Sequence, residues 1–205
     1  MKRVLITGGQ GDIAQAIAGK LIIQGGYEVK TPGKDEMDVT KTESVTQFIE
    51  NFVPDILINN AGYVFPQSIK DCDLERERKA FDINLFGTFN CTAAVLKMNK
   101  AAKIINIGSS AATKIHGTWS SYCAAKAAVV MATKCWAEDG VDAVCVSPGR
   151  TATKMRRGLY PNEDKSTLLM PEDFAAIVLY AIEGKYAPGE HINVTLQNVG
   201  DLLNA

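Results

Sequence analysis

Near the N-terminus the chain reads Val4-Leu5-Ile6-Thr7-Gly8-Gly9-Gln10-Gly11-Asp12-Ile13-Ala14. Val4 to Thr7 is a short apolar strand, and Asp12 to Gln24 carries apolar residues at helical spacing. The glycines between them let backbone amides approach a phosphate group, and the beginning of a helix favours its negative charge. Because tight turns from strand to helix need glycine anyway, a purely structural interpretation of this turn stays open.

The same alternation of strand and helix continues along the chain. Thr40 and Glu43 have capping-box spacing before a helix that reaches about Phe52. Further strands are expected at residues 28–31, 55–59, 103–107, 142–147 and 191–195, and further helices at residues 74–98, 121–137 and 171–183. Continuous apolar strands are typical of a parallel sheet with helices on both faces. The pattern predicts a doubly wound α/β fold, a Rossmann-type sheet of about seven strands.

The length and the charge limit what this protein can be. Its 205 residues suffice for one domain with a substantial core, and we expect a single domain over residues 1–205. Residues 156–169 are polar and punctuated by proline, which is typical of a mobile loop over a site. The 22 Lys and Arg nearly balance the 23 Asp and Glu, so no strong positive field is available to bind nucleic acid or anionic lipid.

The cysteines and the hydropathy indicate a location. The 5 cysteines form no CxxC pair, which favours a reducing compartment over a disulfide framework. No secretory leader is recognisable, and no apolar run approaches the roughly 20 residues that cross a bilayer. We therefore expect a cytoplasmic protein. The 2 histidines stand far apart and form no metal-binding pattern, so no metal site is expected.

A second cluster, Tyr122-Cys123-Ala124-Ala125-Lys126, carries acid–base chemistry. A tyrosine four residues before a lysine on a helix places both side chains on one face. An ammonium near a phenol favours the phenolate and lowers its pKa from about 10, which suits a general acid or base. The alternative is a helix surface that simply carries both residues.

Taken together, these stretches resemble the short-chain dehydrogenase/reductases along nearly the whole chain, with this protein a short member. The turn at residues 7–14 resembles the cofactor turn of that family, and the helix with Tyr122 and Lys126 resembles its catalytic helix. The other matching stretches are Asp38-Val39, Asn59-Asn60-Ala61-Gly62, Asn106-Ile107-Gly108-Ser109-Ser110, and Pro148-Gly149 with Thr153. Their order and spacing match those of the family.

The resemblance implies a catalytic tetrad of Asn84, Ser109, Tyr122 and Lys126. Tyr122 would donate or accept the proton, and Lys126 would lower its pKa and bind the nicotinamide ribose. Ser109, thirteen residues before Tyr122, is preferred to Ser110 and would hydrogen-bond the substrate oxygen. Asn84 would hold a water that links Lys126 to solvent, although it could instead be a buried amide that distorts its helix.

The resemblance also implies the cofactor-binding residues, which come from every matching stretch. They are Gly8, Gln10, Gly11, Asp12, Ile13, Lys34, Asp38, Val39, Asn60, Ala61, Gly62, Tyr122, Lys126, Pro148, Gly149, Thr151 and Thr153. Asp12 and Ala14 stand where the family's turn has glycine. A carboxylate at Asp12 would repel a pyrophosphate unless it caps the helix and points away.

The cofactor and the substrate are less strongly indicated. Lys34 follows the second strand, where a basic side chain binds the 2′-phosphate of NADP, so NADP is favoured over NAD. Asp35 or Glu36 could bind the ribose of NAD instead, and Lys34 could simply be a solvated lysine. We expect the substrate site to be built from residues 148–170. Candidate pocket residues are His116, Trp119, Arg150 and Met155.

The expected function is an oxidoreductase that moves a hydride between nicotinamide and a small carbonyl or alcohol compound. The alternative is a non-catalytic protein that binds NAD(P) and senses redox state, because fold alone cannot choose between the two. The helices at residues 74–98 and 121–137 carry apolar residues on more than one face, so a homodimer or homotetramer is expected.

Overall fold

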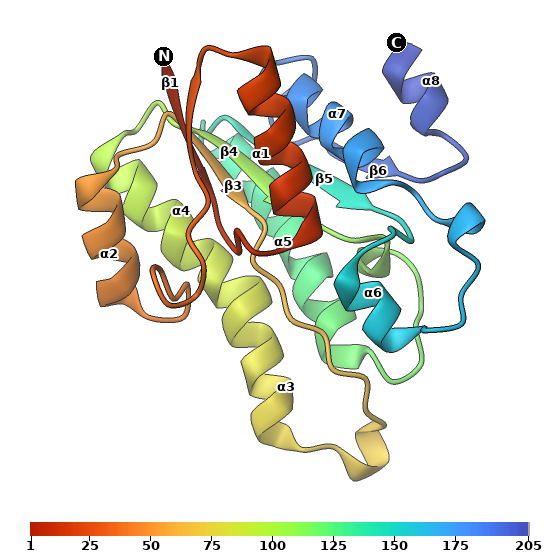
Figure 1. Cartoon of the computed structure of the whole chain (residues 1–205). Helices are drawn as coiled ribbons and strands as arrows, with labels where there is room; N and C mark the ends of the chain where they lie inside the picture. The colour runs from red at the N-terminus through yellow and green to blue at the C-terminus, as the bar shows by residue number, and fades with distance from the viewer. Residues whose placement is uncertain (205) are drawn as a thin grey trace.

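The computed structural model describes residues 1–204 and shows a parallel sheet in the order β2-β1-β3-β4-β5-β6 (Figure 1). The strands are β1 (Lys2–Ile6), β2 (Tyr27–Lys30), β3 (Ile56–Asn59), β4 (Lys103–Ile107), β5 (Ala143–Pro148) and β6 (His191–Val194). The chain runs outward from β1 to β2 and then crosses to β3 on the other side of β1, which confirms the doubly wound fold. The described residues form six strands, slightly fewer than the expected number of about seven.

Helices cover both faces of the sheet. One face packs against α1 (Asp12–Gln24), α7 (Pro171–Ile182) and α8 (Val199–Asn204), and the other against α2 (Thr42–Asn51), α4 (Gly87–Met98) and α5 (Ser120–Glu138). Successive strand residues point to opposite faces: Val4 and Ile6 join the α1 core, whereas Leu5 joins the core under α2 and α4. Two apolar layers therefore hold the sheet in place. No helix within residues 1–204 is both long enough and apolar enough to cross a membrane.

The long helix expected at residues 74–98 is present but irregular. It consists of α3 (Leu74–Phe81), a π-helical segment (Asp82–Phe86) and α4. Asn84 lies in the π-helical segment, and its side-chain amide donates to the carbonyl oxygens of Ala80, at 2.8 Å, and Tyr63, at 2.7 Å. A side-chain amide that bonds a carbonyl one turn back competes with the regular backbone ladder, which accounts for the local distortion.

The expected capping box at Thr40 and Glu43 is wrong. The helix α2 begins one residue later, after Lys41, and no side chain caps it. The Thr40 hydroxyl instead donates to the Asp38 carboxylate at 2.7 Å. Asp38 is therefore held at the end of the turn that follows β2, where it faces the cleft described below.

The loop expected at residues 156–169 has more structure than the sequence indicated. Most of α6 (Lys154–Leu159) and a 3₁₀ turn (Lys165–Thr167) fall within it, and two more 3₁₀ turns of the same length lie elsewhere, at Ile69–Asp71 and Ser110–Ala112. Residues 151 and 169 pair in a parallel bridge, and Leu169 donates its backbone N–H to the Arg150 carbonyl at 2.8 Å. Residues 151–169 are called the cap loop here. The bridge between residues 151 and 169 joins the two ends of this loop beside the sheet.

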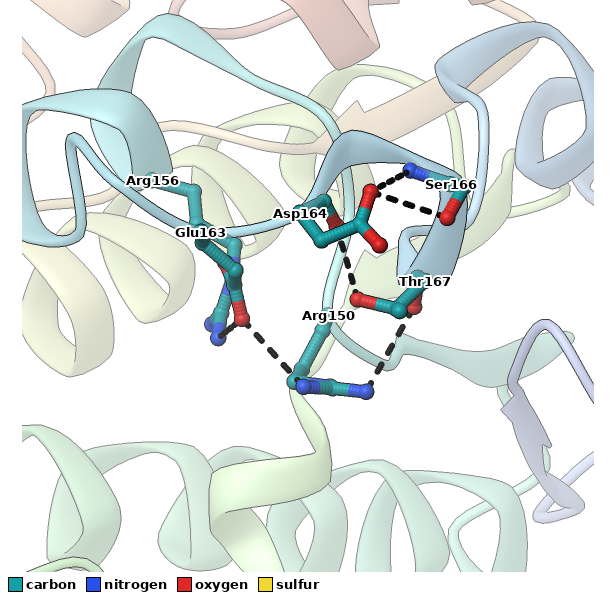
Figure 2. Close-up of polar contacts among 6 residues, drawn as sticks. All are labelled: Arg150, Arg156, Glu163, Asp164, Ser166 and Thr167. Carbon is teal, nitrogen blue, oxygen red and sulfur yellow. Dashed lines mark hydrogen bonds and ion pairs between the residues drawn. The ribbon is translucent and has the colours of Figure 1, made fainter.

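Ion pairs and short hydrogen bonds hold the cap loop in shape (Figure 2). The Glu163 carboxylate accepts from Arg156 at 2.7 Å and from Arg150 at 3.3 Å. Hydrogen bonding from Arg156 holds the pKa of Glu163 below its usual range. Asp164 accepts from the backbone N–H of Ser166 at 2.9 Å. The internal contacts of the loop are thus charge-assisted and local.

Candidate active site

A cleft of about 480 Å³ lies at the carboxyl ends of the central strands. The glycine turn after β1 forms one wall, and the ends of β3 and β4 form the floor. The helix α5 and the first turn of the cap loop form the opposite wall. Ligands of doubly wound sheets bind at this edge, where the strand order reverses. The cleft is therefore the position in this fold where a nucleotide is expected.

The glycine turn brings the chain close to β3. Gly8 has a φ of +66°, and a Cβ atom there would lie 2.8 Å from the Cα of Ala61. The Thr7 hydroxyl accepts from the backbone N–H groups of Asn60, at 3.0 Å, and Ala61, at 2.9 Å. These bonds fasten the turn to the Asn60–Gly62 wall, so both sides of this end of the cleft have a fixed spacing.

The beginning of α1 faces the cleft. Gln15 donates the first backbone hydrogen bond of the helix, to Gly11 at 3.0 Å. The N–H groups of the preceding residues have no helical acceptor, and they carry the positive end of the helix dipole. Gly11, Asp12 and Ile13 line the cleft at this point. This arrangement fits an anionic group such as the pyrophosphate of a dinucleotide.

Three of the four catalytic residues expected from the sequence lie together at the other end of the cleft: Tyr122 and Lys126 line it, and Ser109 is beside Tyr122. Tyr122 and Lys126 lie one turn apart on α5, and the Lys126 ammonium is 5.9 Å from the centre of the Tyr122 ring. Lys126 is 4% exposed and donates to the carbonyl oxygen of Ile107 at 2.8 Å. Ser109 follows β4, and its hydroxyl accepts from the Ala111 N–H at 3.1 Å. The structure therefore brings these three side chains to one place.

The pKa values of this cluster differ from the sequence-based expectation. Burial raises the pKa of Tyr122, and a hydrogen bond with Ser109 works against that rise. Burial also lowers the pKa of Lys126 to about 8. The spacing alone predicted a lowered Tyr122 pKa, but burial removes both groups from water and so favours their neutral forms.

The side chain of Asn84 forms hydrogen bonds with the backbone and does not line the cleft. It is fully buried, and it bonds the backbone of Tyr63 and Ala80. The backbone carbonyl oxygen of Asn84 accepts a hydrogen bond from the Thr88 hydroxyl at 3.1 Å. These hydrogen bonds fit the interpretation of Asn84 as a buried amide that distorts its helix, and its assignment to the catalytic tetrad stays a prediction.

Most of the expected cofactor-binding residues line the cleft, and two do not. Gly149 donates its N–H to the Val194 carbonyl at 2.7 Å, and Thr151 is 5% exposed with its hydroxyl bonded to the Gly149 carbonyl. Both residues therefore bond backbone groups near the start of the cap loop and do not line the cleft. The cleft is also lined by residues that were not among the expected cofactor-binding residues: Met37, Thr40, Lys79, Asp82, Ile83, Ile107, Gly108 and Lys154. Ile107 and Gly108 belong to the matching stretch before Ser109, whereas most of the others belong to no motif.

Among the candidate pocket residues only Met155 lines the cleft. Trp119 is 9% exposed and packs edge-to-face on Tyr122, with ring centroids 5.7 Å apart and planes at 87°. His116 stacks on Trp119 at 5.0 Å, and Tyr160 of the cap loop lies 6.3 Å from it. These aromatic rings form a wall beside Tyr122, while Arg150 is engaged by Glu163.

Lys34 lines the cleft, and a carboxylate lies opposite it. The Lys34 ammonium is 4.0 Å from the carboxylate of Asp38. Burial raises the pKa of Asp38, but hydrogen bonds from Thr40 and the charges of Lys34 and Lys41 outweigh it and leave that pKa lowered. Asp38 is therefore a carboxylate that partly neutralises Lys34.

Neither acidic alternative for binding the NAD ribose faces the cleft. The Glu36 carboxylate accepts from the backbone N–H of Gly33 at 2.8 Å, and it closes its own turn. Asp35 is exposed, and it does not line the cleft. Asp38 is thus the acidic residue of this segment that lies at the cleft.

Asp12 does not cap its own helix, because Gly11 occupies the N-cap position. Its carboxylate turns across the cleft to the cap loop, where it accepts from the backbone N–H of Lys154. The Lys154 ammonium lies 4.0 Å from the same carboxylate. The negative charge at Asp12 is therefore countered by the opposite wall.

The sequence profile described as short chain dehydrogenase matches residues 34–164 of this chain. The chain belongs to the short-chain dehydrogenase/reductase family. It is 28% identical over 234 aligned residues to 2,3-dihydro-2,3-dihydroxybenzoate dehydrogenase of Bacillus subtilis, with 90% of each chain covered. It is 32% identical to 3-oxoacyl-[acyl-carrier-protein] reductase of Synechocystis, with 78% of this chain and 68% of the relative covered.

Solved structures agree with the fold of this short-chain dehydrogenase/reductase. 4-Hydroxyisoleucine dehydrogenase in complex with NADH has a TM-score of 0.82 at 21% identity, covering 95% of this chain and 96% of the other. ElxO with bound NADP has a TM-score of 0.82 at 22% identity, covering 95% and 97%. The family match and the named relatives identify the protein as an NAD(P)-dependent dehydrogenase or reductase.

Proposed function

We propose that this short-chain dehydrogenase/reductase transfers a hydride between a nicotinamide dinucleotide and a small carbonyl or alcohol compound, with Tyr122 as general acid and base. One observation carries the proposal: Tyr122 and Lys126 line the same cleft as the glycine turn and Asp38-Val39. A dinucleotide that extends from Asp38 toward Tyr122 would have its reactive end beside a proton donor. The names of the relatives, a dehydrogenase of a dihydroxy compound and a reductase of a 3-oxo compound, support this class of substrate.

Each part of the dinucleotide has residues that fit it. The N–H groups at the beginning of α1 would hold the pyrophosphate, and Asp38 with Val39 would flank the adenine. Lys126 would bind the nicotinamide ribose, and Pro148 with Thr153 would lie against the nicotinamide. When bound, the nicotinamide supplies or accepts the hydride.

The protein supplies the proton. In reduction, Tyr122 gives its phenolic proton to the substrate oxygen as the carbonyl carbon gains a hydride, and an alcohol results. The Ser109 hydroxyl donates to the same oxygen while negative charge develops there. The Lys126 ammonium then stabilises the phenolate that remains. Because burial raises the pKa of Tyr122, the phenol stays protonated at neutral pH, which suits a general acid.

We propose NADP as the preferred dinucleotide. Lys34 is the cation of the turn after β2 that lines the cleft, and it is the residue available to a 2′-phosphate. Asp38 weakens this preference, because its carboxylate lies 4.0 Å from the same ammonium. NAD is therefore the second candidate, with Asp38 as the acidic residue closest to the ribose position.

The remaining features of the proposal concern the assembly. We propose a single cytoplasmic domain whose substrate side is built from residues 148–170 and whose partner is a small molecule rather than nucleic acid or membrane. Trp119 and Tyr160 would form the apolar side of the substrate position, next to Tyr122. The exposed apolar residues on α4 and α5 support a homodimer or homotetramer.

The test follows NADPH and NADH absorbance with a panel of ketones, aldehydes and quinones. Tyr122→Phe should reduce turnover by roughly 10²- to 10⁴-fold and leave cofactor affinity nearly unchanged, because only the proton donor is removed. Tyr180→Phe is the matched control, since its hydroxyl bonds the Leu203 carbonyl, outside the cleft. Near-normal turnover by Tyr122→Phe would exclude the role of Tyr122. Tight NADPH binding without turnover of any compound would favour the redox-sensing alternative.

A further inference from the structure

The carboxylate of Asp12 spans the cleft. Asp12 is the first residue of α1, on the glycine turn, and Lys154 is the first residue of α6, in the cap loop. The carboxylate accepts a hydrogen bond from the Lys154 backbone and forms an ion pair with its side chain at 4.0 Å. Figure 1 shows α6 beside the end of α1 at which that helix begins.

These two contacts join the cap loop to the glycine turn within residues 1–204. The other polar contacts of the loop are internal or lie at its base, such as Glu163 with Arg150 and Arg156 (Figure 2). The loop therefore has two independent sets of restraints. One set gives it shape, and the contacts of Asp12 fix where its first turn stands relative to the cleft.

The charge of Asp12 makes this contact sensitive to what occupies the cleft. Asp12 and Lys154 both line it, next to the N–H groups that fit a pyrophosphate. An isolated carboxylate there would repel a phosphate, because like charges a few ångströms apart interact unfavourably. The N–H and the ammonium of Lys154 counter that charge only while the cap loop stands in its present position.

We propose that Asp12 is a positioning residue that latches the cap loop across the cleft, so that closure of the loop and binding of a dinucleotide favour each other. With the loop displaced, the carboxylate loses its partner and opposes the phosphates. With the loop in place, the same carboxylate is neutralised and the wall of the cleft is complete. By thermodynamic linkage, loop closure and dinucleotide binding favour each other by the same free energy. The proposal rests on the proposed function in one respect, that a dinucleotide binds in the cleft.

The first measurement is limited trypsin digestion, with cleavage after Arg156 and Arg157 of α6 followed by mass spectrometry. NADPH should slow this cleavage in the wild type. Asp12→Ala should accelerate it several-fold without cofactor and should reduce the protection that NADPH gives. Glu163→Gln is the matched control: it loosens the loop from inside, so cleavage accelerates, but the protection factor of NADPH stays as in the wild type.

The second measurement separates a latch from a purely structural role, using NADPH affinity by calorimetry without substrate. Lys154→Gln leaves the Asp12 charge without its ammonium, so affinity should fall about three- to tenfold. Asp12→Asn keeps the shape of the side chain and an acceptor for the N–H but removes the charge. The double variant Asp12→Asn/Lys154→Gln should recover most of the affinity that Lys154→Gln alone loses.

The outcomes separate the two proposals. Additive effects of the two substitutions on NADPH affinity, or unchanged protection in Asp12→Ala, would overturn the latch and leave the proposed function intact. Failure of the wild type to bind either NADPH or NADH would overturn the proposed function and the coupling together. In that case, unchanged cleavage of Asp12→Ala without cofactor would also exclude a role for Asp12 in holding the loop.

Discussion

The buried ammonium of Lys126 donates a hydrogen bond to the carbonyl oxygen of Ile107, 2.8 Å away at the end of β4. No carboxylate contributes to its titration, and burial lowers the pKa of Lys126 to about 8. Keeping this buried group charged therefore costs the folded state free energy.

That cost predicts a pH dependence of stability. Between pH 8 and about 10.5 the folded state has released the Lys126 proton while the unfolded state still binds it, so stability rises with pH over this window. The free energy of unfolding should gain about 3 kcal/mol across it, relative to Lys126→Met. Urea unfolding of both proteins at several pH values measures this difference. Parallel pH curves for the two proteins would show that the Lys126 pKa is not lowered.

Lys34→Ala should weaken NADPH binding about three- to tenfold and leave NADH nearly unchanged. An exposed contact to a phosphate is worth roughly 1 kcal/mol or more, and the nearby Asp38 reduces that gain. Added salt should weaken NADPH more than NADH, since the additional phosphate is the screened partner. Lys41→Ala is the control, because Lys41 acts on Asp38 without lining the cleft. Equal losses for both dinucleotides would assign Lys34 a structural role.

The protein should form dimers or tetramers through α4 and α5. Phe86, Phe89 and Met131 are 60%, 42% and 59% exposed, and this much apolar surface favours association. Phe89→Lys with Met131→Lys should give monomers in light scattering at micromolar concentration. Ile23→Lys, on α1 at the opposite face of the sheet, should keep the assembly. A wild-type monomer at that concentration would contradict the prediction.

His191 should make the protein less stable in mild acid. Its Nε2 atom lies 2.8 Å from the Ser147 hydroxyl, and burial, with the charge of Lys134, lowers its pKa. Protonation therefore favours the unfolded state, and the free energy of unfolding should fall as the pH drops below about 6.5. His191→Gln should remove most of this slope in urea unfolding. His116→Gln, which changes the other histidine, should retain it, and loss of the slope in both variants would exclude the assignment.

The sequence predicted the features that depend on local order. Strand and helix periodicity located every strand of the sheet, and the spacing of Tyr122 and Lys126 placed them on one helix face. The glycine turn was recognisable because close approach to Ala61 leaves no room for a side chain at Gly8. These features follow from geometry that a short stretch of chain determines by itself.

Features that depend on distant residues could not be read from the sequence. The Asp38 carboxylate faces Lys34 only because the chain turns tightly after β2, and Asp12 meets Lys154 across 142 positions. The raised pKa of Tyr122 follows from burial by the surrounding fold, which residue spacing does not report. Thr40 has the spacing of a helix cap, but its hydroxyl bonds the Asp38 carboxylate, and α2 begins after Lys41.

The tight turn after β2 also limits how this enzyme can be re-engineered. Residues 33–39 line the cleft through Lys34 and Asp38, while Met37 and Val39, 3% and 7% exposed, also pack into the core beneath α2. In a longer connection, one stretch of chain could line the cleft and another could pack into the core. Here a substitution aimed at dinucleotide preference, at Lys34 or Asp38, falls directly beside the residues that pack into the core, Met37 and Val39. Mutant libraries directed at this segment should therefore lose soluble protein before they exchange one dinucleotide for the other.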